Sequence, residues 1–330
     1  MAKAPGDTDL DYLAPFASNL LAEFRLLPLL TQFAIVILFV SGIFVHLFAY
    51  NVRTAHDAPS IFTTGGIFFT FTHLGYIDQQ WLRTNFDKIF PRLFDDNFKC
   101  ALEGLAYSPA SKSIYSLLKE FSVVENALRF KTAGKYSREK MIERLCLAYL
   151  WAAEDLQSER FSLLFETSAP DDLLEATQFF WGIRGEKLSD DQIERIVSFW
   201  VRCISWSEEI DLVPDKLLSK LSVLTCYLKS ISPRLERLLF AVAPYVHVNY
   251  NADNFIKELG RLVENSPDEV SAVLGKVLET YTPSYDFEDK LKNLLIKLME
   301  KGKRADVILY AERLRNLPGM PEFYAQAIRG

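Results

Sequence analysis

One long stretch of the chain, from Leu26 to Val52, contains no charged side chain. Its centre reads FAIVILFVSGIFVHLFAY, over Phe33–Tyr50. An α-helix that rises about 1.5 Å per residue needs roughly 20 apolar residues to cross the hydrocarbon core of a bilayer. Soluble helices of this length usually keep a polar stripe, which this run lacks. The sequence therefore predicts a transmembrane helix with residues 28–50 in the lipid bilayer, and a buried core helix of a soluble protein is the alternative.

A second uncharged run extends from Ala58 to Ile77 and is richer in Thr and Gly. Small residues let helices pack closely in lipid, and a Thr hydroxyl can bond the preceding helical turn. Two interpretations stay open for residues 58–77: a second span that forms a hairpin with the first, or a buried helix that opens the next domain. His46 and His73 would be candidates for proton relay inside a membrane, and packing residues otherwise.

Charge divides the chain into two kinds of polypeptide. Residues 1–80 hold 9 of the charged side chains, and residues 81–330 hold the other 71, so charge is more than twice as dense in the second part. We therefore expect a membrane-anchoring head over residues 1–77 and an α-helical repeat domain over residues 78–330. The net charge of −6 argues against a protein whose main task is to coat nucleic acid.

Apolar residues recur at spacings of three and four from Asp78 onward, which predicts helices throughout. Ser189, followed by Gln192 at capping-box spacing, predicts a helix start, and so does Ser266–Pro267. Tyr245–Tyr250 alternates as a strand would, and we interpret it as a loop or extended link. The expected helices are 79–90, 95–106, 110–121, 137–153, 171–182, 189–208, 213–231, 251–265, 267–279, 285–302 and 304–315.

Successive helices joined by short polar turns favour antiparallel helical hairpins stacked side by side. The sequence shows no strict period. The predicted fold class is all-α: an N-terminal transmembrane helix, or a two-helix hairpin, followed by an irregular HEAT/TPR-like α-solenoid.

The stretch RTAHDAPSIFTTGGIFFTF (Arg53–Phe71), which follows the first hydrophobic run, resembles the start of the MotA/TolQ/ExbB proton-channel superfamily, in particular its branch in Zorya-type anti-phage systems. The similarity covers about residues 10–71. The matching positions are Pro59, Thr63, Thr64, Gly66, Ile67, Thr70 and Phe71. The resemblance implies a membrane head of the kind found at the start of an ion channel.

Residues 72–330 resemble the C-terminal helical-repeat region of large bacterial proteins of anti-phage defence. Two stretches carry most of this similarity, Tyr245–Val270 and Pro283–Tyr324, and residues 79–91 and 180–200 are similar to earlier helices of that region. In those proteins the region follows an effector domain. The resemblance implies a helical array that binds a partner in defence against phage.

No phosphate-binding, nucleotide-binding, hydrolase or metalloprotease motif occurs in the sequence. The sequence contains four cysteines, which are not at metal-binding spacing, and four scattered histidines. We therefore predict no catalytic residue, no cofactor-binding residue, no metal ligand, no cofactor and no enzyme activity. The cysteines are Cys100, Cys146, Cys203 and Cys226, and the histidines are His46, His56, His73 and His247.

Three further groups of side chains have a structural interpretation beside a functional one. Asp286, Glu288 and Asp289, beside Tyr285, fit the acidic first turn of a helix better than a metal site. The basic run Lys297, Lys301, Lys303 and Arg304 fits a solvated helix end better than a contact with nucleic acid or lipid. Four tryptophans at helical positions fit core or groove-lining anchors, and an exposed one would be a partner-binding hot spot: Trp151, Trp181, Trp200 and Trp206.

The sequence as a whole favours a non-enzymatic, membrane-anchored helical-repeat interaction protein linked to bacterial anti-phage defence. We expect a protein partner on the helical array, the lipid bilayer around residues 28–50, and no nucleic acid, and the sequence leaves a homo-oligomer open. The expected location is the bacterial inner membrane with the C-terminal domain in the cytoplasm, where free thiols persist. The alternatives are a subunit of a MotA/TolQ/ExbB-like proton channel and a soluble, cytoplasmic α-helical scaffold.

Overall fold

The computed structural model describes residues 80, 83–84, 86, 90, 95–130, 134–166, 170–210, 213–248, 251–281 and 288–329. Most of these residues are helical, and no strand occurs among them. The chain divides into two compact units, Met1–Pro109 and Ala110–Gly330. The boundary predicted at 77/78 and the predicted spans at 28–50 and 58–77 lie outside the described residues. Among the helices that are described, none combines the length and the apolar character that a bilayer crossing requires.

The described part of the first unit contains helix α5 (Asp95–Ala106), which coincides with the predicted helix 95–106. Its Phe98 packs edge-on against Phe90, with ring centroids 6.5 Å apart, and Phe90 stacks on Phe86 at 5.0 Å. All three rings are buried. Apolar burial of this kind is the main source of stability for such a helix.

The second unit consists of short α-helices and 3₁₀ turns in close succession. The α-helices are α6 (Lys112–Glu120), α7 (Val123–Arg129), α8 (Lys135–Leu150), α9 (Glu159–Glu166), α10 (Asp171–Gly182), α11 (Asp190–Glu209), α12 (Asp215–Leu221), α13 (Pro233–Val242), α14 (Ala252–Leu262), α15 (Pro267–Thr280), α16 (Glu288–Glu300), α17 (Arg304–Arg313) and α18 (Met320–Arg329). The 3₁₀ turns are η1 (Ile183–Gly185), η2 (Ser222–Tyr227) and η3 (Ala243–Tyr245).

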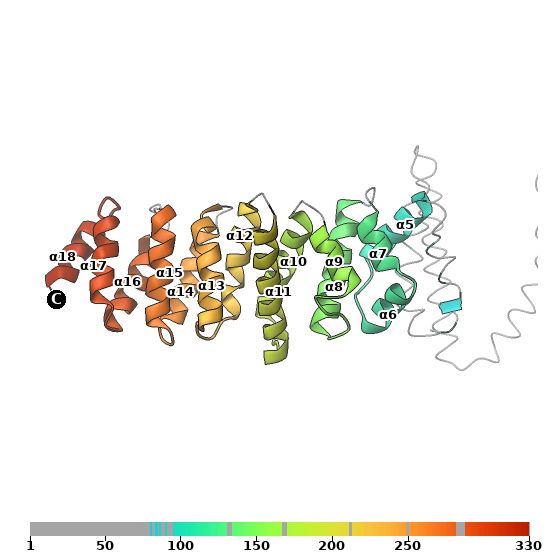
Figure 1. Cartoon of the computed structure of the whole chain (residues 1–330), viewed down its shortest axis with the longest axis horizontal. Coiled ribbons are helices and arrows are strands. Elements are labelled where there is room, and N and C mark those ends of the chain that lie inside the picture. Colours follow the sequence, from blue (N-terminus) through green and yellow to red (C-terminus); the bar gives the residue numbers. More distant parts are fainter. Residues whose placement is uncertain are drawn as a thin grey trace, which may run out of the picture. The chain divides into compact units, whose positions relative to one another are not determined.

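Helices of the second unit follow one another in chain order and form two layers (Figure 1). Most helices pack against the helix two places along the chain. In the first layer, α8 packs on α10, α10 on α12, and α14 on α16. The step from α12 to α14 is made by η2, which follows α12 and packs on α14. The second layer is built in the same way, with α7 on α9, α11 on α13, α13 on α15 and α15 on α17. This is the arrangement of stacked helical hairpins that an α-solenoid has.

A spatial repeat is present although the sequence shows no strict period. Helices α12, α14 and α16 begin at Asp215, Ala252 and Glu288, which are 37 and 36 positions apart. The bonds between neighbouring repeats have the same spacing: Lys290–Asp253, Lys297–Gly260, Lys301–Glu264, Asn265–Lys229 and Ser271–Asp306 join residues 35 to 37 positions apart. The positions of helices and of bonds between repeats therefore recur about every 36 residues, although the residue types do not.

The predicted helix starts are confirmed at two sites. Ser189 caps α11, because its Oγ accepts from the Gln192 backbone N–H at 3.2 Å while the Gln192 side chain accepts from the Ser189 N–H at 2.9 Å. Pro267 occupies the first turn of α15, where its missing N–H costs nothing. Because capping groups satisfy the first N–H donors of α11, its boundary is fixed locally.

The predicted helix 213–231 is instead two elements, α12 and η2. Ser222 donates its hydroxyl to the carbonyl of Ser219 at 2.6 Å, and Thr225 donates to Ser222 at 2.7 Å. All three side chains are buried. Such bonds to carbonyls three residues back accompany the tighter 3₁₀ winding of this segment.

Four short helices differ from the prediction. The predicted helix 110–121 corresponds to α6, and α7, α9, α13 and α18 lie in segments for which no helix is predicted. Each of these four has ten residues or fewer, so few turns of apolar periodicity reveal it. Of Tyr245–Tyr250, the described residues 245–248 form part of η3 and the turn after it.

The core of the second unit lies between the two layers. Its largest cluster joins four helices: Tyr149 of α8 packs on Phe161 of α9 at 5.1 Å, and Phe180 of α10 packs on Phe199 of α11 at 5.0 Å. Trp206 is also buried and donates its indole N–H to the carbonyl of Phe165 at 2.9 Å. Because the core fills the space between the layers, the outward faces of both layers remain for contacts with other molecules.

Candidate functional site

A buried cluster of ionised side chains ties the first helices of the second unit together. Arg160 of α9 bonds Glu125 of α7 at 2.7 Å and Glu154, in the loop after α8, at 3.3 Å. Lys119 of α6 adds a third ion pair to Glu154 at 3.0 Å. The Glu154 side chain is only 1% exposed, and the pKa of the neighbouring Tyr115 is raised by burial first and by Glu154 second. Two cations neutralise two carboxylates here, so the cluster stabilises the packing of α6, α7 and α9 against the loop after α8.

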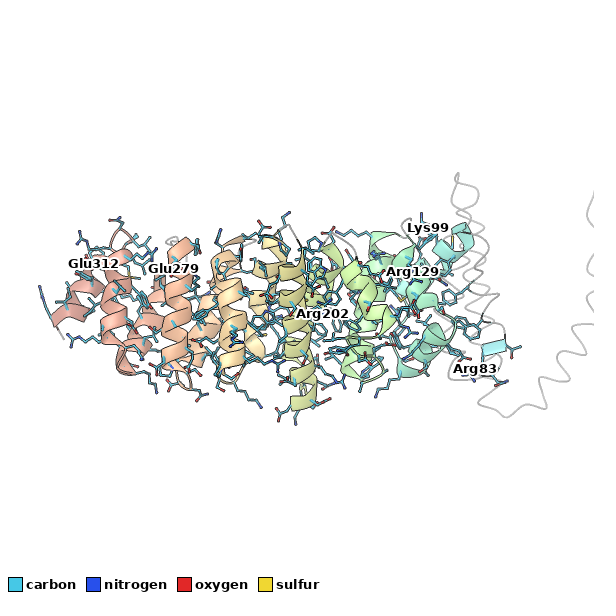
Figure 2. All side chains as sticks on the ribbon, viewed as in Figure 1. Arg83, Lys99, Arg129, Arg202, Glu279 and Glu312 are labelled. Carbon is cyan, nitrogen blue, oxygen red and sulfur yellow. The ribbon has the colours of Figure 1, made fainter. Side chains whose placement is uncertain are left out.

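The outward face of the second layer carries ion pairs of mixed sign. Arg129 and Arg202, labelled in Figure 2, lie on α7 and α11, and they pair with Glu159 at 2.9 Å and Glu209 at 3.2 Å. Glu279 of α15 is held by Lys276 at 2.6 Å. In each of these three pairs the opposite charges lie side by side, so the pairs themselves contribute little long-range field.

The first layer carries acidic side chains at its α8–α10 end. Glu175 of α10 has its pKa raised by burial first and next by the carboxylate of Glu139, with Glu143 adding to the effect. Lys135 and Lys140 pair with the two α8 carboxylates at 3.6 Å and 2.7 Å. The negative charges of three side chains therefore gather at this end of the layer.

A run of cations begins where α10 ends, around Trp181. The guanidinium carbon of Arg184, in η1, lies 4.1 Å from the centre of the indole ring, and the Nζ atom of Lys220 in α12 lies 4.8 Å from it. Partial burial lowers the pKa of Lys220, and Glu175 acts in the opposite direction. Cation–π contact therefore holds two positive side chains against one half-buried ring.

The run of cations continues across η2 into α14. Arg261 of α14 donates to the carbonyls of Thr225 and Cys226, at 3.2 Å and 3.3 Å, at the end of η2. The pKa of the Cys226 thiol is raised to about 12, chiefly by burial and then by Glu258, while Arg184 and Arg261 oppose the rise. Because both guanidinium groups act on this thiol, they lie on adjoining parts of the surface.

A groove between α14 and α16 completes this surface. Its volume is about 290 Å³, and it is lined by Ile256, Lys257, Gly260, Arg261, Lys290, Asn293, Leu294 and Lys297. Residues spaced three and four apart on each helix share a face, which brings these side chains to opposite walls of one groove. We call the six cations Arg184, Lys220, Lys257, Arg261, Lys290 and Lys297 the basic strip.

The cations of the basic run that the sequence analysis singled out bond mainly to other groups of the same chain. Lys301 pairs with Glu264 at 2.5 Å, and Lys303 pairs with Asp268. Arg304 donates to the carbonyls of Ala327 and Ile328, at the end of α18, where a cation also complements the helix dipole. Of the run, only Lys297 faces the groove, and it donates to the carbonyl of Gly260 at 2.9 Å.

The four tryptophans singled out in the sequence differ in burial, and none of them lines the groove between α14 and α16. Trp200 and Trp206 are buried, whereas Trp151 and Trp181 are partly exposed. Lys112 lies 6.0 Å from the ring of Trp151. Trp181 contacts two members of the basic strip, Arg184 and Lys220.

The structure gives the remaining sequence candidates no common site. Cys146 and Cys203 are buried, where burial raises the pKa of each thiol, while Cys100 and Cys226 are partly exposed. His247 is exposed and stacks on Tyr281, with ring centroids 5.4 Å apart. His46, His56, His73, Tyr285 and Asp286 lie outside the described residues.

Glu288 and Asp289 begin α16, as the helix-start interpretation predicted. Among the residues that the structure describes, no three His, Cys, Asp or Glu side chains are grouped so that they could hold a metal ion.

The basic strip is the functional candidate that sequence reasoning missed. Its members are separated by up to 113 positions, from Arg184 to Lys297, and only the packing of repeats joins them. A signal was present in the spacing, since Lys257 follows Lys220 by 37 positions and Lys297 follows Arg261 by 36.

A comparison of the chain with protein families, with curated proteins and with solved structures finds no match.

Proposed function

We propose that this chain is a non-enzymatic interaction protein whose helical array binds a protein partner. The observation that carries the proposal is the basic strip. Its six cations lie on η1, α12, α14 and α16, and four of them line one groove between α14 and α16. Repeat arrays with a charged outward face are suited to recognising long partner segments.

The wider context of the proposal comes from the sequence. Residues 28–50 anchor the chain in a bilayer in this proposal, since the run Leu26–Val52 has the length and composition of a span. The resemblances of residues 10–71 and 72–330 support a role in bacterial anti-phage defence, with the array in the cytoplasm. A HEAT/TPR-like repeat is the finer description of the array that we propose.

Membrane attachment is tested by carbonate washing of membranes from cells that express the full chain. An anchored protein stays in the pellet, and complete release into the supernatant would remove the anchoring part of the proposal. The same cells, challenged with phage, test the defence role: the efficiency of plating falls if the chain protects and is unchanged if it does not.

Partner binding is tested by cross-linking in the native cells followed by identification of the joined protein. Reconstitution of that protein with the purified full chain must then reproduce the complex. Failure of every identified candidate to bind the purified chain would contradict the interaction role.

A further inference from the structure

We propose that the α14–α16 groove of the basic strip binds an acidic segment of the partner protein, with carboxylates seated between Lys257, Arg261, Lys290 and Lys297. This inference rests on the proposed function and names the chemistry of the partner. It is carried by the charge, the lining and the dimensions of one groove.

Four cations line the groove, and only two of them are paired with a carboxylate. Asp253 bonds Lys290 at 2.5 Å and 2.6 Å, and Glu258 bonds Arg261 at 2.8 Å. Lys297 is held by the neutral Gly260 carbonyl, and Lys257 is exposed and makes no ion pair or hydrogen bond within the part of the chain that the structure describes. Two positive charges therefore remain uncompensated, which favours an anionic occupant.

The floor of the groove is uncharged. Ile256 and Leu294 are buried at its base, and a Cβ atom added to Gly260 would meet no atom within 4 Å. Asn293 supplies a neutral polar group from α16. An apolar floor with cationic walls fits a peptide that carries acidic side chains and small apolar ones together, because the apolar part loses little by leaving water.

Distances along the helices set the spacing of the carboxylates. Lys257 and Arg261 are four residues apart, which is about 6 Å along the helix axis at a rise of about 1.5 Å per residue. Acidic residues at i and i+4 of a partner helix, or at i and i+2 of an extended segment, have about this separation. The partner segment is therefore expected to carry acidic residues with one of these two spacings.

A nucleic acid fits the groove less well than an acidic peptide. Single strands are held by stacking of bases on open aromatic rings, and no aromatic residue lines the groove. Trp181, which contacts Arg184 and Lys220 of the strip, is not among the groove's lining residues. The net charge of −6 on the whole chain also repels a long polyanion.

The inference is tested with the full chain in a neutral detergent. A fluorescein-labelled peptide of alternating Glu and Ala is titrated by anisotropy, and the Lys257→Glu variant is compared with the unaltered protein. We expect binding of the peptide to weaken by about tenfold, since the reversal places a negative charge beside the acidic segment. Lys257 makes no ion pair or hydrogen bond among the described residues, so the variant is expected to keep its fold.

Two further variants separate charge at the groove from charge in general. Arg237→Glu reverses an exposed cation on α13, in the second layer, and is expected to leave peptide binding unchanged. Gly260→Leu fills the floor without altering charge and is expected to weaken binding as Lys257→Glu does. Equal weakening by Arg237→Glu, or full binding in both groove variants, would overturn the inference.

Oligothymidylate is titrated against the same proteins as the competing occupant. Tighter binding of the oligonucleotide than of the acidic peptide, lost in Lys257→Glu, would assign the groove to nucleic acid and overturn the inference. If the partner found by cross-linking binds Lys257→Glu as well as the unaltered chain, the groove assignment fails while the interaction role stands. If no partner binds at all, the interaction role itself fails.

Discussion

Arg138 and Asp172 join α8 to α10 through two parallel hydrogen bonds, with Nε–Oδ1 at 2.8 Å and Nη2–Oδ2 at 2.5 Å. The guanidinium group also donates to the carbonyl of Leu128, at the end of α7, at 2.6 Å. The hydrogen bonds that Arg138 donates to Asp172 raise the pKa of the guanidinium group. The Arg138 side chain thereby links α8 and α10 of the first layer to α7 of the second.

Replacement of Arg138 by Met is expected to destabilise the protein by about 3 kcal/mol, because it leaves the nearly buried carboxylate of Asp172 without a cation. The measurement is urea unfolding followed by circular dichroism. Arg138→Met combined with Asp172→Leu should cost less than the two single changes together, because neither charge is then left alone. Additive costs would contradict the coupling. Arg234→Met, which breaks an exposed pair with Glu194, is the control and should cost less than about 1 kcal/mol.

The buried cluster around Arg160 predicts a large loss of stability when its central cation is removed. In Arg160→Leu, the buried carboxylates of Glu125 and Glu154 keep only Lys119 as a cation, and we expect a loss of about 3–5 kcal/mol. Urea unfolding followed by circular dichroism measures the loss, and a value below about 1 kcal/mol would refute this role of the cluster.

The control for the Arg160 experiment is Arg129→Leu. Arg129 pairs with Glu159, and both side chains are more than half exposed, at 55% and 64%. Exposed pairs contribute less than about 1 kcal/mol, so this variant should show no large loss of stability.

Two helix ends predict opposite effects of exchanging Gly and Ala. After α8, Ala152 has φ +60°, and the N–H of Ala153 bonds the carbonyl of Ala148 at 2.9 Å. After α16, Gly302 has φ +84°, and the N–H of Lys303 bonds Leu298 at 2.9 Å. Both are Schellman ends, in which Gly is the favoured left-handed residue because it has no Cβ atom.

Ala152→Gly should therefore stabilise the protein by about 0.5–1 kcal/mol, and Gly302→Ala should destabilise it by about 1 kcal/mol. Differential scanning calorimetry of the two variants checks both signs. A lower melting temperature for Ala152→Gly, or an unchanged one for Gly302→Ala, would contradict the prediction.

Cys226 predicts a loss of stability in alkali. Its pKa is raised to about 12 in the folded protein, chiefly by burial, whereas an unfolded thiol titrates near 8.5. The contribution to stability is complete below about pH 8.5 and is lost as the pH rises toward 12. Between pH 8 and 10.5, the melting temperature should fall less in Cys226→Ala than in the unaltered protein. An identical fall in both would refute the assignment.

The neighbours of Cys226 give a second measurement at neutral pH. In a Cys100→Ser background, Glu258→Gln should lower the pKa of the thiol and speed its alkylation, because the carboxylate disfavours the thiolate. Arg261→Met should slow the same reaction. Since the two variants act on one thiol in opposite directions, a general loosening of the structure would not produce this pattern.

Helices with clear apolar periodicity or a recognisable start are the part of the fold that sequence reasoning predicts well. The bounds of α10 coincide with the prediction of 171–182, and α11 begins one residue after its capping residue Ser189. The sequence analysis does not predict α13, which has ten residues and carries Pro233 in its first turn. The basic strip could not be predicted from composition or from neighbouring residues, since it depends on which helices of different repeats come to lie side by side.

The spacing of 35 to 37 residues between bonded partners, as in Lys297 and Gly260, has a consequence for synthesis on the ribosome. At about 5–20 residues per second, translation delivers one such interval in about 2–7 s. Each hairpin of α12 to α17 can thus dock on the hairpin made just before it, without waiting for the end of the chain. Nascent helices would expose apolar surface only briefly, which limits the time in which one unfinished chain can associate with another.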